Sequence, residues 1–535
     1  MLKLRRPLRG TLGTCAILLS LGLSWSSPAA AQAETPKRGG TAIFVLTQDP
    51  TSVNPATSSN TADREVGSMI YQGLIQVSLD YSIKPLLAKS WTISPDGLTY
   101  TLDLNKAQWH DGKPFTSADV KYSLIEVNSK YSSVFAAAGK VIDTIETPAP
   151  DKVVIKLKQS FGPFILSLGT IQGGAIMPAH VFQGTDPMKN PATLTTPVGT
   201  GPFKLSEWKR SDNIRLVKNK DYFEKDRPYL DEVVAKIIPQ AAARIQALKA
   251  GEVDLVQLFP PNDQAQVKAD ANLKIEKSDV APGMTFIFLN NSKKPFDDRK
   301  VRQALFMAID RDYLMKNAFF DVGSVGVNPF TTDIQWVANK DIDYRKMYPY
   351  DTAKANALLD EAGVKRGADG KRFATKITIF SNSYPEFQQV ALALKSMWGA
   401  VGVDVAVEAM EDATLMKKAY VDRDFDVTMN SYTSYSDPAL GIARAFITSG
   451  IGKTFANPSG YSNPEVDKLF DEGQSGTTYE QRGPSYRKVQ EIIARDVPSL
   501  TIRQYLNIDA ATKRLRGLWG NVQGNGDWTN AWLAQ

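Results

Sequence analysis

Two histidines and one cysteine are the residues of this 535-residue sequence best suited to nucleophilic or general-base chemistry: His110, His180 and Cys15. His110 stands beside an Asp-Gly turn, and His180 closely follows a proline. Neither belongs to a nucleophile elbow, an HExxH helix or a CxxC pair, the motifs that position a nucleophile, a base or a metal ion. Two separated histidines are also too few to form a dedicated binding site for zinc or nickel. The sequence therefore predicts a protein that is not an enzyme and that holds no metal and no cofactor.

Aromatic and small polar residues favour binding over catalysis. Most aromatic side chains fill protein cores, but Tyr432 and Tyr435 are expected to follow a strand over 425–429, in a loop rich in Ser, Thr and Asn. Ligands collect at strand ends in α/β sheets. We therefore predict ligand contacts from this loop, through Asn430, Tyr432, Ser434 and Tyr435.

Local patterns place strands and helices around these residues. A Ser-Pro-Asp-Gly turn at 94–97 precedes alternating apolar and polar residues over 98–104, the period of a half-buried strand. A helix is expected over 487–495. A β-α-β unit, which implies a parallel strand pair, is expected from 377–380, 387–400 and 403–407. The length suggests two or three lobes, and the fold class is α/β.

The first 33 residues have the pattern of a cleavable signal peptide. An apolar stretch over 11–25 follows the basic residues Lys3, Arg5, Arg6 and Arg9. An A-x-A site ends at Ala33, so the mature chain should begin at Glu34 in the periplasm of a Gram-negative bacterium. The paired arginines leave the twin-arginine route open beside the general one. Cys15 is a weak lipidation candidate, because the apolar stretch continues beyond it.

Removal of this leader changes the charge balance. The chain has 63 Lys and Arg against 57 Asp and Glu, and losing four basic residues brings the balance to +2. This small net charge gives no reason to predict nucleic-acid binding. The loss of Cys15 leaves a chain without cysteine, which suits an oxidising compartment. No other run of 18 apolar residues predicts a membrane span.

A series of motifs resembles the family 5 extracytoplasmic solute-binding proteins, the receptors of peptide, opine and nickel ABC importers. The first group is YQGL, PLLAKSW, DGLTYTLDL and HDGKPFTSADVKYS, within residues 71–124. The later ones are PVGTGPF at 197–203, ALKAGEVDL at 247–255, PFDDRKVRQAL at 295–305 and YSNPEVD at 461–467. In the third of these later motifs, Arg299 and Arg302 are expected to form structural ion pairs. The resemblance covers essentially the whole mature chain.

The resemblance implies a type II periplasmic binding protein fold, similar to cluster C, with two lobes that close by a hinge and an additional subdomain in the first lobe. The implied divisions are a signal peptide at 1–33, first-lobe parts at 34–72, 197–284 and 506–535, an inserted subdomain at 73–196, and a second lobe at 285–505.

The resemblance also implies a function. The protein would be a monomeric periplasmic receptor that captures a peptide-like or other small polar solute between its lobes and delivers it to an ABC permease and ATPase. In family members the loop at 56–62 often contributes to the ligand cleft. Ser59, Asn60 and Thr61 are therefore expected contacts from the first lobe.

One departure from the family pattern bears on the ligand. Peptide-binding members commonly hold the ligand's α-amino group with an Asp about four residues before the Pro of a GWxxDYxDP loop. That position falls on Ser434, or on Tyr435 in a shorter loop, and neither is anionic, while Asp437 is expected to be structural. The departure favours a neutral opine-like or sugar-like solute, although peptides stay possible. A secreted hydrolase and a sensor that loads a chemoreceptor without transport are the other classes left open.

Overall fold

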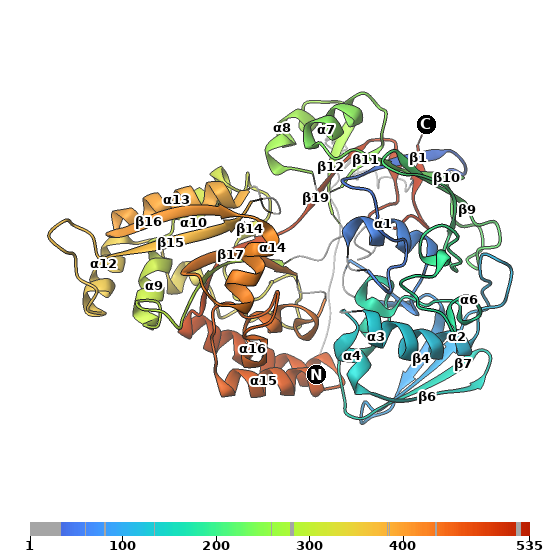
Figure 1. The fold of residues 1–535 in the computed structure, drawn as a ribbon, viewed down its shortest axis with the longest axis horizontal. Helices are drawn as coiled ribbons and strands as arrows, with labels where there is room; N and C mark the ends of the chain where they lie inside the picture. The colour runs from blue at the N-terminus through green and yellow to red at the C-terminus, as the bar shows by residue number, and fades with distance from the viewer. Residues whose placement is uncertain are drawn as a thin grey trace, which may run out of the picture. The chain divides into compact units, whose positions relative to one another are not determined.

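The computed structural model describes residues 34–535 except for 59, 80–81, 133, 258, 279–282, 382–383, 385, 434–435, 521–525 and 535. The predicted signal peptide, residues 1–33, lies outside the described residues. From Lys37 onward the chain builds three principal β-sheets and the helices that cover them (Figure 1).

A seven-stranded mixed sheet draws its strands from three separate stretches of the chain. Their order is β12 (Leu273–Lys277), β19 (Ile508–Thr512), β11 (Leu255–Val256), β1 (Thr41–Leu46), β10 (Glu232–Ile237), β9 (Asn213–Lys218) and β8 (Phe203–Lys209). β1 pairs in parallel with β10 and β11, and the other neighbours are antiparallel. The C-terminal β19, red in Figure 1, lies beside the green strands β11 and β12.

A four-stranded antiparallel sheet is formed by residues between β1 and β8. Its order is β4 (Ala88–Ile93), β5 (Thr99–Leu104), β7 (Lys152–Leu157) and β6 (Ile142–Ala149). The predicted turn before β5 is confirmed, because Gly97 N donates to Ser94 O at 2.8 Å and Gly97 has φ +70°. Alternate residues of β5 are buried, as its sequence pattern predicts.

A six-stranded mixed sheet lies in the second half of the chain. Its order is β14 (Ser324–Val325), β18 (Ser499–Tyr505), β13 (Gly283–Leu289), β17 (Val427–Thr433), β15 (Phe373–Phe380) and β16 (Val403–Met410). The predicted β-α-β unit is confirmed, since β15 and β16 are parallel and α13 (Glu386–Ala400) connects them.

Helices cover both faces of this six-stranded sheet. Met429 of β17 belongs to a hydrophobic cluster with α9 (Arg299–Met307), α10 (Arg311–Asn317), α12 (Thr352–Glu361) and α13. Tyr432 belongs to another with α14 (Asp412–Met416), α15 (Pro464–Ser475) and α16 (Tyr479–Asp496). Successive side chains of a strand point to opposite faces, so β17 is buried on both sides.

The remaining elements are shorter or lie around the other two sheets. The helices are α1 (Thr61–Ile70), α2 (Ser117–Tyr122), α3 (Ser129–Tyr131), α4 (Ala136–Val141), α5 (Phe164–Ser167), α6 (Ala179–Phe182), α7 (Ala241–Lys249), α8 (Gln264–Lys268) and α11 (Tyr344–Met347). The strands form two pairs, β2 (Ile75–Val77) with β3 (Ile83–Pro85), and β20 (Leu515–Arg516) with β21 (Trp532–Leu533).

Two segments carry the chain between the seven-stranded and six-stranded sheets. One joins β12 to β13 through residues 278–282, and the other joins β18 to β19 through residues 506–507. β13 starts at Gly283, two residues before the predicted start of the second lobe. The predicted domain boundaries themselves stay a prediction.

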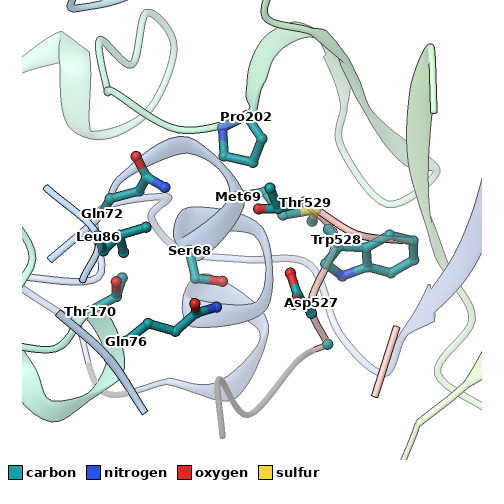
Figure 2. A pocket seen from close by; sticks show the side chains of 11 residues that line it. Ser68, Met69, Gln72, Gln76, Leu86, Thr170, Pro202, Asp527, Trp528 and Thr529 are labelled. Atoms are coloured by element: carbon teal, nitrogen blue, oxygen red, sulfur yellow. The ribbon is translucent and has the colours of Figure 1, made fainter. Parts of the chain in front are cut away.

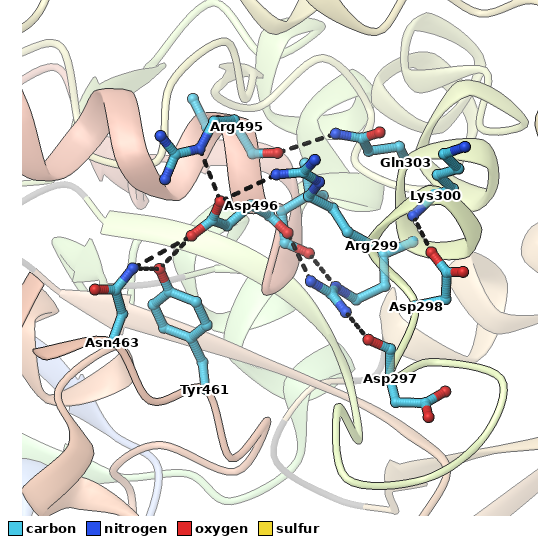
Figure 3. A network of polar contacts seen from close by, with 12 residues as sticks. Asp297, Asp298, Arg299, Lys300, Gln303, Tyr461, Asn463, Arg495 and Asp496 are labelled. Carbon is cyan, nitrogen blue, oxygen red and sulfur yellow. Dashed lines mark hydrogen bonds and ion pairs between the residues drawn. The ribbon is translucent and has the colours of Figure 1, made fainter. Parts of the chain in front are cut away.

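Two of the recognised motifs meet in a polar network at the end of α16 (Figure 3). Asp496 accepts a hydrogen bond from Tyr461 Oη at 2.8 Å and lies 3.7 Å from Arg299 Nη1. Arg302 donates to backbone carbonyls, including Val497 O and Phe296 O, both at 2.8 Å. The ion pair expected for Arg299 is confirmed, whereas the one expected for Arg302 is wrong, because Arg302 donates to carbonyl oxygens in a structural role.

Candidate functional site

The strand that carries the predicted second-lobe contacts is longer than its sequence indicates. We expected the strand to end at 429 and a loop to begin at Asn430, and this expectation is wrong. β17 continues to Thr433, which pairs opposite Gly283 of β13. Polar residues remain in the strand here because β13 satisfies their backbone groups. Ser434 and Tyr435 lie outside the described residues.

Asn430 and Tyr432 lie on one face of β17, and each is only 1% exposed. Asn430 Nδ2 donates to Tyr420 Oη at 2.6 Å, and Tyr432 Oη donates to Ala456 O at 2.6 Å. Burial raises the pKa of Tyr432 well above its ordinary value, so the phenol stays protonated. Both polar groups are engaged within the chain, and their contact with a ligand stays a prediction.

The other face of β17 carries hydroxyl groups near the crossovers. Ser431 Oγ lies 2.9 Å from Thr285 Oγ1, and Thr433 Oγ1 lies 2.7 Å from Tyr505 Oη. Ser431 and Thr433 are partly exposed. A hydroxyl group both donates and accepts hydrogen bonds, so this end of the sheet can bind a polar solute.

A buried ion pair fixes the segment that follows β17. Asp437 is fully buried, and its Oδ1 accepts from Ala439 N to cap the turn Pro438–Leu440. Arg482 of α16 contacts both carboxylate oxygens, with Nη1–Oδ2 at 2.7 Å and Nη2–Oδ1 at 2.8 Å. One charge-assisted hydrogen bond and one close ionic contact therefore hold the two charges together. The structural role expected for Asp437 is confirmed.

In the predicted first lobe, Asp63 organises the loop that precedes α1. Its fully buried carboxylate accepts hydrogen bonds from Thr51 N, Thr51 Oγ1 and Ser58 Oγ, at distances of 2.7–2.8 Å. Three donors on one carboxylate hold both ends of the loop against the helix.

Asn60 begins α1 as its N-cap. Its Oδ1 accepts from Ala62 N and from Gln48 Nε2, both at 3.0 Å. Thr61 is the exposed first residue of the helix, and Ser59 lies outside the described residues. The side-chain oxygen of Asn60 is therefore used locally, and the three first-lobe contacts stay a prediction.

A pocket opens directly beside this predicted loop. Its lining comes from Pro55, Ala56, Thr57, Ser58, Tyr131, Ser132, Val134, Ile171 and Gly173. The sequence interpretation missed the contribution of Tyr131, Ser132, Val134, Ile171 and Gly173. The Gly173-Gly174 pair was a usable signal, because Gly173 has φ +95° and a Cβ atom there would lie 2.8 Å from Phe135 N.

A second pocket lies between α1 and the C-terminal segment (Figure 2). Several of its polar lining groups already form hydrogen bonds with other residues of the chain. Gln72 Nε2 donates to Tyr222 Oη at 2.8 Å, and Asp527 Oδ2 accepts from Asn530 Nδ2 at 2.8 Å. No predicted site residue lines this pocket, so it adds no support to the predicted site.

The predicted inserted subdomain and second lobe touch each other away from the crossovers. Gly162 N donates to Gln474 O at 2.6 Å. Leu440, three residues after Asp437, packs against the hydrophobic core of the four-stranded sheet. The segment that follows the predicted second-lobe contacts therefore meets the other lobe.

The two histidines make contacts that stabilise the fold. His110 Nδ1 accepts from Gly199 N at 3.3 Å, so its Nε2–H donates to Gly201 O at 3.0 Å. Burial lowers the pKa of His110 to about 4, which keeps the ring neutral. His180 Nε2 lies 2.7 Å from Asp111 Oδ2. Within the described part of the chain, no group of three or more His, Cys, Asp or Glu side chains is arranged to hold a metal ion.

The family model described as "Bacterial extracellular solute-binding proteins, family 5 Middle" matches residues 82–453. The chain belongs to this family. This result and the solved structures of relatives confirm the predicted α/β periplasmic binding protein fold of type II, with two lobes. The members of this family are extracytoplasmic proteins. No helix in the described ranges is long and apolar enough to cross a membrane.

Individual relatives of this binding protein differ in what they bind. The oligopeptide-binding protein AppA of Bacillus subtilis is 29% identical over 508 residues, covering 92% of this chain and 91% of AppA. DppA from Helicobacter pylori, solved with the peptide STSA, is 27% identical with a TM-score of 0.76, covering 93% of this chain and 99% of DppA. AgaA from A. tumefaciens R10, solved with agropinic acid, is 26% identical with a TM-score of 0.75, covering 93% of this chain and 99% of AgaA.

Proposed function

We propose that this protein is a periplasmic receptor of an ABC importer, which binds a peptide-like solute between its lobes and delivers it to the permease and ATPase as a monomer. The likeness to AppA and DppA over at least 92% of the chain carries the proposal. A chemoreceptor-loading sensor would use the same receptor, and permease genes beside this one would favour import.

Hinge closure is the proposed mechanism. Among the strands that the structure describes, the chain passes between the seven-stranded and six-stranded sheets twice, from β12 to β13 and from β18 to β19. Rotation about two short segments moves the sheets without disturbing either core. A solute that contacts both lobes then stabilises the closed form by its differential affinity.

The proposed ligand contacts are the loop residues Ser59, Asn60 and Thr61 of the first lobe and the residues Asn430, Tyr432, Ser434 and Tyr435 of the second. The partly exposed hydroxyls of Ser431 and Thr433 lie on the same strand as two of them. Together these residues offer apolar surface and groups that can donate or accept hydrogen bonds, a combination that is common in small-molecule sites.

An opine-like or sugar-like solute is the second candidate. Neither Ser434 nor Tyr435 offers a carboxylate for a peptide amino group, and AgaA was solved with agropinic acid. Calorimetry with the peptide STSA and its N-acetylated form separates the two candidates. Tight binding that is lost on acetylation supports a peptide held by its amino group. Affinity for STSA that appears only in Ser434→Asp supports the second candidate.

Ligand screening by melting temperature tests the receptor function itself. A bound solute at a hundredfold excess over its Kd stabilises the folded state by about 2.7 kcal/mol. The correct solute should raise the melting temperature and reduce the radius of gyration. A solute that binds tightly without changing the radius of gyration would refute hinge closure.

Export by a signal peptide cleaved after Ala33 is also proposed. N-terminal sequencing of the purified protein should then begin at Glu34, and a lipid on Cys15 would contradict this. We propose no enzymatic activity, because His110 and His180 are held by backbone and carboxylate partners. A turnover assay on peptides would detect a hydrolase.

A further inference from the structure

Arg444 differs from the other described arginines of the predicted second lobe because its guanidinium group has no hydrogen-bond or ion-pair partner. Its Nε is buried and has no hydrogen-bond partner. Arg311 and Arg423 also bury an unpaired nitrogen, but each donates through another nitrogen of the same group. Arg444 forms no hydrogen bond or ion pair through its side chain with any described residue.

The position of Arg444 places it beside the proposed ligand contacts. It lies in the 3₁₀ turn Ile442–Ala445, and its Cζ is 5.2 Å from the ring centroid of Tyr432. The side chain is partly exposed. Leu440 in the same segment packs against the inserted subdomain. Arg444 therefore follows, by four residues, a residue that contacts the inserted subdomain.

Two carboxylates that bind the segments on either side of Arg444 have partners of their own. Asp437 binds Arg482 through both oxygens. Asp467 Oδ1 accepts from Thr448 N at 2.8 Å. A buried donor without a partner is unfavourable, so a compensating anion is expected from outside the chain.

We infer that Arg444 binds a carboxylate group of the solute, an inference that rests on the proposed function. The planar guanidinium group matches a carboxylate with two parallel hydrogen bonds. The ring of Tyr432 beneath it holds the guanidinium plane in place by a cation–π contact. The solute is then an acidic compound, either a peptide with a free carboxyl terminus or an opine-type acid, rather than a neutral sugar.

Calorimetry with matched acid and neutral probes tests this inference. The probes are STSA and its C-terminal amide, and agropinic acid and its methyl ester. Wild-type protein should bind one free acid about 10- to 100-fold more tightly than its neutral form, the worth of a charge-assisted hydrogen bond. Arg444→Gln should abolish this difference by weakening the acid alone, and Arg444→Lys should retain part of it. Equal wild-type affinity for acid and neutral forms, or equal weakening of both by Arg444→Gln, overturns the inference.

Arg345→Gln is the matched control. Arg345 belongs to the same lobe and forms an exposed ion pair with Asp312 at 2.7 Å. Its replacement removes the same charge and should leave the acid preference unchanged. If Arg345→Gln lowers the acid preference as much as Arg444→Gln does, the effect is general electrostatics and the inference fails.

A measurement without ligand separates this inference from the proposed function. If neither acid binds, the proposed solute classes are wrong, whereas Arg444 can still be tested by melting temperature. Arg444→Met keeps the apolar stem over Tyr432 and removes the unpaired charge. Its melting temperature should equal or exceed that of the wild type, because a group reserved for a ligand does not stabilise the empty protein. A lower melting temperature assigns Arg444 to the fold and overturns the inference.

Discussion

Arg482 and Asp437, 45 residues apart in the sequence, form a buried ion pair in which both side chains are at most 2% exposed. Arg482 also donates to Gly473 O at 2.6 Å and to Tyr486 Oη at 3.2 Å. The pair therefore joins the segment after β17 to α16 and to the end of α15. The ion pair therefore anchors the chain next to the proposed ligand contacts on β17.

Removal of one member of this pair should destabilise the protein strongly. Asp437→Asn leaves the buried guanidinium group of Arg482 without its counter-charge, and a broken buried pair costs about 3–5 kcal/mol. Chemical denaturation should show this loss in the free energy of unfolding. Asp404→Asn is the control, since Asp404 pairs with Lys371 on the surface and should have no measurable effect. Equal effects of the two substitutions would contradict the prediction.

The stability of the protein should fall in mild acid because of His110. Burial lowers the pKa of His110 from 6.5 to about 4, so the unfolded chain binds more protons than the folded chain between these values. The free energy of unfolding therefore decreases as pH falls from about 6.5 to 4, by at most about 1.4 kcal/mol per pH unit from this residue. His110→Gln should flatten this part of the curve. Carboxylates contribute to both proteins alike, so parallel curves would show that His110 does not titrate in this way.

Replacing each of two glycines by alanine should change the free energy of unfolding in opposite directions. A Cβ atom at Gly199 would lie 1.8 Å from Ile70 O, whereas one at Gly399 meets no atom within 4 Å. Gly199→Ala should lower the free energy of unfolding by about 1–3 kcal/mol or more, because backbone must move. Gly399→Ala, in helix α13, should raise it by about 0.5–1 kcal/mol. Thermal denaturation of both variants measures the difference, and a stable Gly199→Ala would refute the close approach.

Local signals predicted the elements that local chemistry specifies. The turn before β5 follows from its Pro-Asp-Gly sequence, and α13 of the predicted β-α-β unit is held by hydrogen bonds between residues four apart. In each case the stabilising partner lies within a few residues. The family resemblance supplied the two-lobed periplasmic binding protein fold, which local patterns alone could not.

Elements that depend on distant partners were predicted less well. The sequence predicts that this strand ends at 429, because Ser, Thr and Asn are typical of loops. Pairing with β13 instead extends β17 to Thr433. The helix expected at 487–495 begins at Tyr479, since a capping box of Thr478 and Gln481 outweighs the internal Pro484. Arg444 was missed because an unpaired guanidinium group is visible only when its neighbours are known.

Closure of the lobes should depend on the close approach at Gly162. A Cβ atom there would lie 2.4 Å from Gly476 O and 2.6 Å from Arg482 Nε. Gly162→Val should therefore hold the inserted subdomain away from α15 and α16 and weaken the binding of STSA by tenfold or more, about 1.4 kcal/mol. The free energy of unfolding should change little, because neither core is altered. Calorimetry and small-angle scattering check both effects, with Gly399→Val as the control that adds the same side chain in open space. If Gly162→Val binds STSA as tightly as the wild type and contracts equally on binding, this contact has no part in closure.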